Sequence, residues 1–251
     1  MRIALLGYGK MGKAVEKIAE ARGHEIVYKI NLENAHNFLS ISLKNVDVAI
    51  DFSMPTSAYD NIMKCFDAKV PVVVGTTGWY DQFDAVKARC ESEGQSMIYS
   101  TNFSLGVNIF FKINKLLSRY MGQRNDYDVM IEEVHHTEKK DHPSGTAITL
   151  AKQILDNSNT KKSWKGRLFF EHQHENVPMQ SLQTDEMLIE SQRIKDVPGD
   201  HTVIYSSAND SIVIKHTAIT RHGFAEGAVL AAEWIQGKKG LFTMEDLLKL
   251  D

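Results

Sequence analysis

The stretch RIALLGYGKMG, residues 2–12, decides how the N-terminal part of the chain folds. Residues 2–6 form a short apolar run that is typical of a buried strand. Glycines follow at positions 7, 9 and 12, where a helical pattern of apolar residues begins. A strand that passes through a glycine-rich turn into a helix is typical of the first unit of a doubly wound α/β sheet.

The same turn predicts a binding site for phosphate groups. Glycines let the backbone approach a ligand closely, and the free N–H groups at a helix start bind a pyrophosphate. Glu33 stands about 20 residues further on, where an acidic residue binds ribose hydroxyl groups. A turn that is merely tight would show the same glycines. The cofactor-binding residues predicted here are Gly7, Tyr8, Gly9, Lys10, Met11, Gly12 and Glu33.

Further strand–helix units follow the first one. Strands are expected at 26–30, 46–52, 70–74 and 97–99. The valine-rich run at 70–74 is typical of a strand buried on both faces of a parallel sheet. The loops after the last two strands lie at the sheet edge where ligands bind in such folds, although plain turns have similar sequences. These loops add Gly75, Thr76, Thr77, Asn102 and Phe103 to the predicted cofactor site.

The pattern changes after residue 103. A long apolar helix is expected first, and hairpin-style strands follow later in the chain. The expected elements are helices at 105–121, 146–155, 226–235 and 241–250, and strands at 128–134, 187–192, 201–206 and 212–217. The predicted fold class is therefore α/β, with a Rossmann-like doubly wound parallel sheet in residues 1–103. A central α+β domain with a mixed, largely antiparallel sheet is predicted in residues 104–220.

Composition excludes several classes of protein. Lys+Arg number 29 and Asp+Glu 32, so the formal net charge of −3 gives no basic field for nucleic acid. No apolar run approaches the roughly 20 residues that a membrane span requires. Only two cysteines are present, which suits a reducing cytosol better than a disulfide scaffold. We therefore expect a cytoplasmic protein that binds neither nucleic acid nor membranes.

A second cluster of chemically active residues lies at 133–147, EVHHTEKKDHPSGTA. His135 and His136 end a predicted strand and point to opposite sides, and Lys139 follows as a cation. Pro143 and Ser144 then open a helix, whose free N–H groups favour a carboxylate. A proton donor, a cation and an anion site within a dozen residues fit a small anionic substrate.

Two other interpretations compete for this cluster. It resembles a solvated polar loop in composition, although a lone histidine would suit that better than this cluster does. A metal site would use His135, His136 and His142 beside Glu132 and Glu133. Adjacent histidines on a strand diverge, and the sequence has no H-E-x-x-H or paired-cysteine spacing. No metal is therefore predicted.

Residues 133–147 match the pattern E-x-H-H-x-x-K-x-D-x-P-S-G-T-A at every fixed position. This pattern resembles the signature of the dihydrodipicolinate reductase family, which acts in diaminopimelate and lysine biosynthesis. The resemblance extends over nearly the whole chain and includes 75–78, 102–107, 198–202 and Arg221 with 224–228. It implies reduction of 4-hydroxy-tetrahydrodipicolinate by a nicotinamide cofactor, with loss of water.

The resemblance also implies residue roles and an assembly. His135 would be the general acid/base and Lys139 the proton donor. Residues 221–251 would complete the dinucleotide-binding domain, and residues 104–220 would bind a dicarboxylate and form a homotetramer. The residues implied to bind substrate are His136, Ser144, Gly145, Thr146 and Arg221. Ser100 and Thr101 join Asn102 and Phe103 along the implied cofactor site.

Two departures from the family pattern concern the cofactor. The segment between the strands at 26–30 and 46–52 is short. Asn34 follows Glu33 where many members carry an arginine that meets the 2′-phosphate of NADPH. We expect a preference for NADH over NADPH, although Lys10 offers a cation for a phosphate. Two alternatives are another nicotinamide oxidoreductase acting on an amino or imino acid, such as an aspartate dehydrogenase, and a non-catalytic NADH sensor. The glycine turn alone does not separate them from a reductase. The His-His-Lys signature favours the reductase, because a sensor would be expected to lose the proton donors while it keeps the glycine turn.

Overall fold

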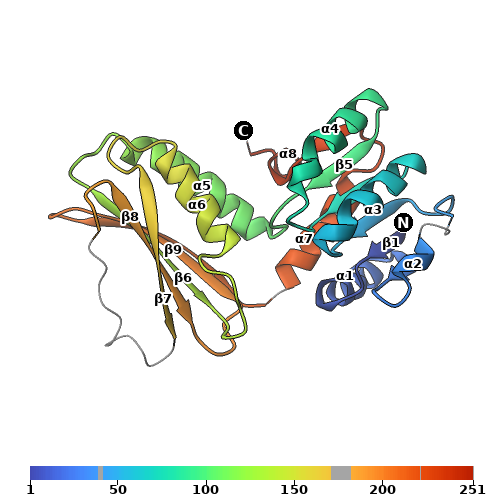
Figure 1. Cartoon of the computed structure of the whole chain (residues 1–251), viewed down its shortest axis with the longest axis horizontal. Coiled ribbons are helices and arrows are strands. Elements are labelled where there is room, and N and C mark those ends of the chain that lie inside the picture. Colours follow the sequence, from blue (N-terminus) through green and yellow to red (C-terminus); the bar gives the residue numbers. More distant parts are fainter. Residues whose placement is uncertain (39–41, 171–181, 221, 251) are drawn as a thin grey trace. The chain divides into compact units, whose positions relative to one another are not determined.

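A computed structural model describes residues 1–38, 42–170, 182–220 and 222–250. The chain forms two compact units, one made of Met1–Asn108 with His222–Asp251 and the other of Ile109–Arg221 (Figure 1). The boundary predicted after residue 103 lies ahead of helix α5, Leu105–Met121, whereas the division between the units falls within this helix.

A six-stranded parallel sheet forms the first unit, in the order β11-β5-β4-β3-β1-β2. Its strands are β1 Arg2–Leu6, β2 Glu25–Ile30, β3 Val48–Asp51, β4 Val72–Val74, β5 Ser96–Tyr99 and β11 Gly240–Phe242. Its helices are α1 Lys10–Ala21, α2 Ala35–Phe38, α3 Pro55–Asp67, α4 Phe83–Ser92, α7 His222–Trp234 and α8 Met244–Leu248, with a short 3₁₀ turn at Tyr80–Gln82.

The sheet is buried on both faces, as the apolar strands predict. Along β1, Ala4 and Leu6 pack in one core with α3 and α4, whereas Ile3 and Leu5 pack in another with α1 and α7. Successive side chains of a strand point to opposite faces of the sheet, so β1 contributes apolar side chains to the core on each face. Both cysteines, Cys65 and Cys90, are free and buried in the first of these cores.

The C-terminal segment completes the first unit. Arg22 at the end of α1 donates two hydrogen bonds, of 2.9 and 2.7 Å, to the carboxylate of Glu233 in α7. Residues 241 and 242 were expected to begin a helix, but they lie in β11, which pairs with the open edge of β5. This pairing satisfies the backbone N–H and C=O groups along the outer side of β5, which would otherwise lie unpaired at the edge of the sheet. The helix begins only afterwards, at Met244.

The second unit has a five-stranded mixed sheet, in the order β10-β9-β6-β8-β7. Its strands are β6 Asp128–His135, β7 Ser163–Phe170, β8 Glu186–Arg193, β9 Gly199–Ser206 and β10 Ser211–Ala218. Helix α5 and helix α6, Gly145–Leu155, supply apolar residues to its core, together with Ile131, Ile189 and Val203 from the sheet. No helix among the described residues is long and apolar enough to cross a membrane.

Pairing in this sheet is more evenly divided than predicted. Strands β10, β9 and β6 pair antiparallel, but β6, β8 and β7 pair in parallel. The expectation of a largely antiparallel sheet was therefore wrong for this half. Strand β7 was not predicted, because this edge strand is mostly exposed or half-buried and lacks apolar alternation.

A close approach between α7 and the loop after β5 requires glycine at position 227. A Cβ atom there would lie 1.7 Å from the carbonyl oxygen of Phe103. At Gly223, in the same helix, the nearest atom would be the Ser104 hydroxyl at 3.8 Å. Both glycines therefore lie in the same helix, but only Gly223 has room for a Cβ atom.

We predict opposite effects of alanine at these positions. Gly227→Ala should lower the free energy of unfolding by roughly 1–3 kcal/mol through overpacking. Gly223→Ala should leave it unchanged or raise it by up to about 1 kcal/mol, because alanine favours helix. Urea unfolding of both variants measures this. A stabilising Gly227→Ala would contradict the close approach.

Candidate functional site

Glycine 7 shapes the carboxyl end of β1. Its φ is +93°, and a Cβ atom would lie 2.1 Å from the carbonyl oxygen of Phe52. Helix α1 begins three residues later at Lys10, and its N-cap residue Gly9 has no side chain to occupy the first N–H groups. The helix start is therefore open to an anion, as the sequence predicts.

Two pockets in the first unit collect most of the predicted cofactor residues. The larger, of about 480 Å³, is lined by Gly7, Tyr8, Gly9 and Glu33 together with Asn31, Phe52 and Ser53. The smaller brings Gly9, Lys10 and Met11 to Gly75, Thr76 and Thr77. Gly12 is buried in α1, where a Cβ atom would lie 2.4 Å from the carbonyl oxygen of Gly7. It therefore serves helix–strand packing and does not line either pocket.

Asn34 is engaged in the turn beside the larger pocket. Its side-chain oxygen accepts from the Asn31 N–H at 2.7 Å, and its amide donates to the Lys29 carbonyl at 3.0 Å. The turn therefore presents an acidic group, Glu33, to the pocket, and Asn34 supplies no guanidinium for a phosphate.

A buried carboxylate, missed in the sequence, positions the loop after β4. Asp51 at the end of β3 accepts hydrogen bonds from the hydroxyls of Thr76, at 2.5 Å, and Ser53, at 2.7 Å. Asn61 donates to its other oxygen at 2.8 Å. Burial raises the pKa of Asp51, and these donors oppose the rise. The Thr76 hydroxyl is thus committed to the protein. The sequence signal that could have identified Asp51 is a carboxylate at the carboxyl end of a parallel strand, the sheet edge where ligands bind in such folds.

The loop after β5 is organised by its own side chains. The Ser100 hydroxyl donates to the Asn102 carbonyl at 2.7 Å, and the Asn102 side chain accepts from the Ser104 N–H at 2.9 Å. Phe103 is buried and packs edge-on against Phe52, with ring centroids 6.1 Å apart. Thr101 is exposed. Neither described pocket is lined by these four predicted cofactor residues, whose binding role stays a prediction.

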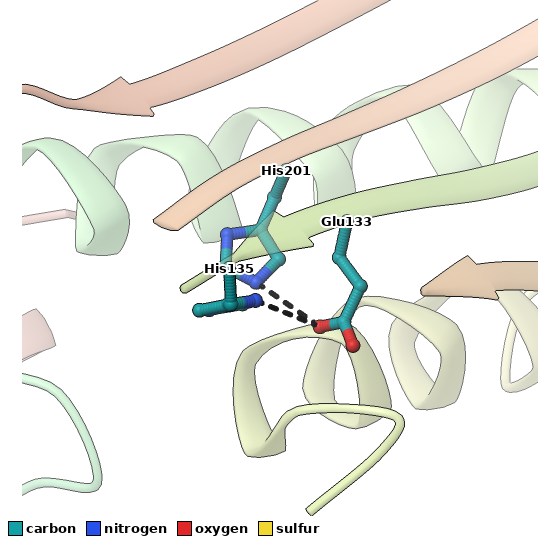
Figure 2. Close-up of side chains that lie close together, drawn as sticks. All are labelled: Glu133, His135 and His201. Atoms are coloured by element: carbon teal, nitrogen blue, oxygen red, sulfur yellow. Dashed lines mark ion pairs between the residues drawn. The ribbon is translucent and has the colours of Figure 1, made fainter. Parts of the chain in front are cut away.

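In the second unit, Glu133, His135 and His201 form a buried cluster (Figure 2). Glu133 and His135 lie two residues apart on β6, so they share one face of the sheet. His201 lies opposite Glu133 on the antiparallel neighbour β9. One oxygen of Glu133, Oε2, is 3.7 Å from His135 Nδ1 and 3.6 Å from His201 Nε2. The two rings meet edge to face at 5.0 Å.

Glu133 is an ionised, fully buried carboxylate. It accepts hydrogen bonds from the Ser144 N–H at 3.0 and 3.1 Å and from the Ser191 hydroxyl at 2.7 Å. Burial alone would raise its pKa, but His201, Ser144 and Ser191 lower the pKa to about 2. The Arg193 guanidinium lies 3.7 Å from its other oxygen.

His135 is uncharged at neutral pH in this state. Burial lowers its pKa to about 3, with a further contribution from His201 and from the cations of Lys139 and Arg193, and Glu133 opposes the fall. No described residue hydrogen-bonds to its Nδ1 atom. Its Nε2 edge faces Gly199, where a Cβ atom would lie 3.0 Å away. Burial and the close backbone of Gly199 thus hold a neutral imidazole in a restricted position.

Lys139 lies in the loop after β6. Its ammonium group is paired with both carboxylate oxygens of Asp141, each at 2.9 Å. Beneath the loop, Arg193 donates to the carbonyl oxygens of Lys139 at 3.3 Å and Asp141 at 2.7 Å. The lysine is therefore placed by a buried arginine that the sequence did not single out. Arg193 directly follows the expected strand at 187–192 and ends β8 in the structure.

Ser144 is the N-cap of α6. Its hydroxyl accepts from the Ala147 N–H at 3.2 Å and lies 3.0 Å from His201 Nε2, and its own N–H is bonded to Glu133. Ser144 is thus committed to the protein, whereas the first N–H groups of α6, at Gly145 and Thr146, have no partner within a helix. His136 is half-buried and lines a separate hollow with Pro198. Arg221 lies outside the described residues.

Among the described residues, Glu133, His135 and His201 are close enough to hold a metal ion, whereas the set with His136 and His142, which the sequence did not favour, is not brought together. The carboxylate, however, already accepts from Ser144 and Ser191, and the Arg193 guanidinium lies beside it. A cation would have to displace these contacts and would be repelled by Arg193. The donor set therefore fits a proton-handling cluster better than a metal centre.

Comparison with known proteins assigns both units to one family. The model "Dihydrodipicolinate reductase, N-terminus" matches residues 1–103, and "Dihydrodipicolinate reductase, C-terminus" matches residues 106–248. A 4-hydroxy-tetrahydrodipicolinate reductase from Christiangramia forsetii is 47% identical over 250 residues, 99% of this chain and 98% of that protein. The protein of the same name from Methanosarcina barkeri is 34% identical, over 97% and 83% of the two chains.

Solved structures agree in fold. A dipicolinate-bound dihydrodipicolinate reductase from a Paenisporosarcina species has a TM-score of 0.75 at 22% identity and covers 97% of both chains. An amine dehydrogenase from Mycobacterium smegmatis has a TM-score of 0.59 at 10% identity, over 96% of this chain and 94% of that one. The predicted fold class, a Rossmann-like parallel sheet with a second mixed sheet, is confirmed, and on its sequence matches over both units the chain belongs to the dihydrodipicolinate reductase family.

Proposed function

We propose that this protein is an NADH- or NADPH-dependent reductase that converts 4-hydroxy-tetrahydrodipicolinate to tetrahydrodipicolinate, with loss of water, in diaminopimelate and lysine biosynthesis. The observation that supports this most strongly is the cluster in the second unit. A neutral histidine and an open helix start lie beside one buried carboxylate, and the arginine paired with that carboxylate holds the loop of Lys139, in a chain that matches the family over both units.

The first unit holds the dinucleotide. The open start of α1 at Gly9 and Lys10 binds the pyrophosphate, and Glu33 binds the hydroxyls of the adenine-linked ribose. Gly75 and Thr77 line the smaller pocket next to this helix start. The nicotinamide supplies the hydride when bound.

The second unit holds the dicarboxylate. The N–H groups of Gly145 and Thr146 bind one carboxylate, and the helix dipole of α6 favours its charge. Lys139 supplies a fixed cation. His136, which lines a separate hollow with Pro198, is assigned to the substrate site on the family resemblance alone. Ser144 acts through the helix cap that it forms. Arg221 is proposed for the substrate site on the family resemblance alone.

The proton chemistry centres on His135. Its pKa of about 3 means that the free protein holds a neutral ring. A dicarboxylate brings two negative charges to this buried position, which stabilise the protonated ring. His135 then becomes a proton donor when substrate arrives, and Lys139 completes the supply of protons.

The assembly is proposed to be a cytoplasmic homotetramer, as the family resemblance implies. Exposed apolar side chains on the two edge strands of the second sheet support association. They are Trp164 and Phe170 on β7 and Ile212 and Val213 on β10.

The reaction is tested by following loss of NADH absorbance while a synthase generates the substrate from pyruvate and aspartate semialdehyde. We expect oxidation that requires the synthase.

His135→Gln should lower kcat by about 10²–10⁴-fold with little change in KM. Lys139→Ala should impair both constants, because it removes a cation that faces the dicarboxylate. A folded protein that binds NADH but does not oxidise it would instead be a non-catalytic NADH sensor.

The cofactor preference is tested by comparing kcat/KM with NADH and NADPH. We predict a higher value with NADH, because Glu33 favours free hydroxyls and Asn34 offers no guanidinium. Asn34→Arg should raise kcat/KM with NADPH roughly tenfold. Asn34→Ala is the control, since it loses the same turn contacts without adding a cation. A wild-type protein that prefers NADPH refutes this account.

Proton uptake on ligand binding tests the role of His135. Its free pKa of about 3 is raised by a bound dianion, so between the two pKa values the complex holds more protons than the free protein. Dipicolinate should therefore bind more tightly as the pH falls from 8 through the raised pKa that His135 has in the complex. Calorimetry in two buffers of different ionisation enthalpy counts the protons. Equal uptake by wild type and His135→Gln would remove His135 from this role.

A further inference from the structure

We propose that Arg193 is a positioning residue for Lys139: its buried guanidinium, held beside Glu133, fixes the loop that presents the lysine to substrate. This inference rests on the proposed function, because Lys139 is assigned to the substrate there. Nothing in the family pattern quoted from residues 133–147 includes Arg193, which lies on another strand.

The arginine is almost completely enclosed. Its relative exposure is 1%, and its guanidinium donates to three backbone carbonyl oxygens, those of Gln192 at 2.9 Å, Lys139 at 3.3 Å and Asp141 at 2.7 Å. A buried charge is tolerated only when its hydrogen-bonding groups are satisfied. The planar fork of arginine reaches several acceptors in different directions, which the point charge of a lysine does not.

Two of the three acceptors belong to the loop that carries Lys139. This loop lies outside helices and strands, and one backbone hydrogen bond, from Lys139 N–H to the His136 carbonyl, ties its first turn together. The carbonyls bonded to Arg193 flank Lys140, so the arginine holds the loop on both sides of that residue. The Lys139 ammonium is then directed by its ion pair with Asp141, whose own backbone is held by the same arginine.

Strand pairing places Arg193 next to the cluster of Glu133, His135 and His201. Strands β6 and β8 pair in parallel, with His135 opposite Arg193 and Glu133 opposite Ser191. Ser191 and Arg193 therefore lie on the face that holds Glu133 and His135. The Glu133 carboxylate accepts a hydrogen bond from the Ser191 hydroxyl at 2.7 Å. Its negative charge lies 3.7 Å from the positive charge of the Arg193 guanidinium. The carboxylate that caps α6 through Ser144 thus also anchors the arginine under the lysine loop.

The test is a double-mutant cycle on kcat/KM. Arg193→Lys keeps the charge beside Glu133 but loses the fork, so we expect KM to rise tenfold or more. If Arg193 acts through Lys139, the same substitution in a Lys139→Ala background should change kcat/KM by less than twofold. Equal, multiplicative effects in the two backgrounds would mean a merely structural arginine and would overturn the proposal.

A matched control exists in the same unit. Lys161 is a buried cation that donates to the carbonyls of Thr184 at 3.0 Å and Glu186 at 2.9 Å and pairs with Asp128 at 2.8 Å. Lys161→Gln should lower the midpoint of thermal unfolding and leave KM unchanged. A rise in KM matching that of Arg193→Lys would show that general destabilisation explains the effect, against the proposal.

Two additions keep the test decisive. If Arg193→Lys does not fold, Arg193→Gln combined with Glu133→Gln removes both charges of the pair, and the cycle with Lys139→Ala is measured on that background. If the wild type shows no reductase activity, dipicolinate affinity replaces kcat/KM as the readout. Weaker dipicolinate binding that depends on Lys139 still supports the positioning role, and binding unchanged by Arg193→Lys refutes it.

Discussion

The second unit depends on one buried charge, the carboxylate of Glu133. A carboxylate without solvent is stable only when donors and cations surround it, and here they come from three separate segments. Ser144 donates from the start of α6, Ser191 and Arg193 approach from β8, and His201 approaches from β9. Because one group needs all of them, the start of α6, the loop that carries Lys139, and His135 are held in a fixed relation.

This arrangement divides the residues at 133–147 into two kinds. Ser144 and Glu133 are saturated by internal contacts, so they shape the site without offering a free group to a ligand. Gly145 and Thr146, at the start of α6, have N–H groups without a helical partner, and Lys139 holds its ammonium group against Asp141; these are the groups proposed to meet the dicarboxylate. Asp51 plays the corresponding part in the first unit, where it uses the Thr76 hydroxyl to shape the loop beside the glycine turn. Each unit therefore combines a buried carboxylate with a more exposed binding edge.

Much of the fold is predictable because its signals are local. The strand–glycine–helix pattern at residues 2–12 and the cluster at 133–147 each lie within one short stretch. What was missed depends on long-range pairing. Ser191 meets Glu133 across 58 positions and His201 meets Ser144 across 57, and neither spacing leaves a periodic pattern. Strands β7 and β11 escaped prediction for a related reason, since sheet edges are defined by their partners and not by alternation.

The most direct test of this account is the ionisation state of Glu133. Protein labelled with ¹³C at the glutamate carboxyl carbon gives one resonance for each residue, and the Glu133→Gln variant identifies the signal that belongs to Glu133. With a pKa of about 2, this resonance should keep its carboxylate position between pH 7 and pH 4. A signal that titrates at or above the ordinary value of 4.5 would contradict the buried charge on which the site is built.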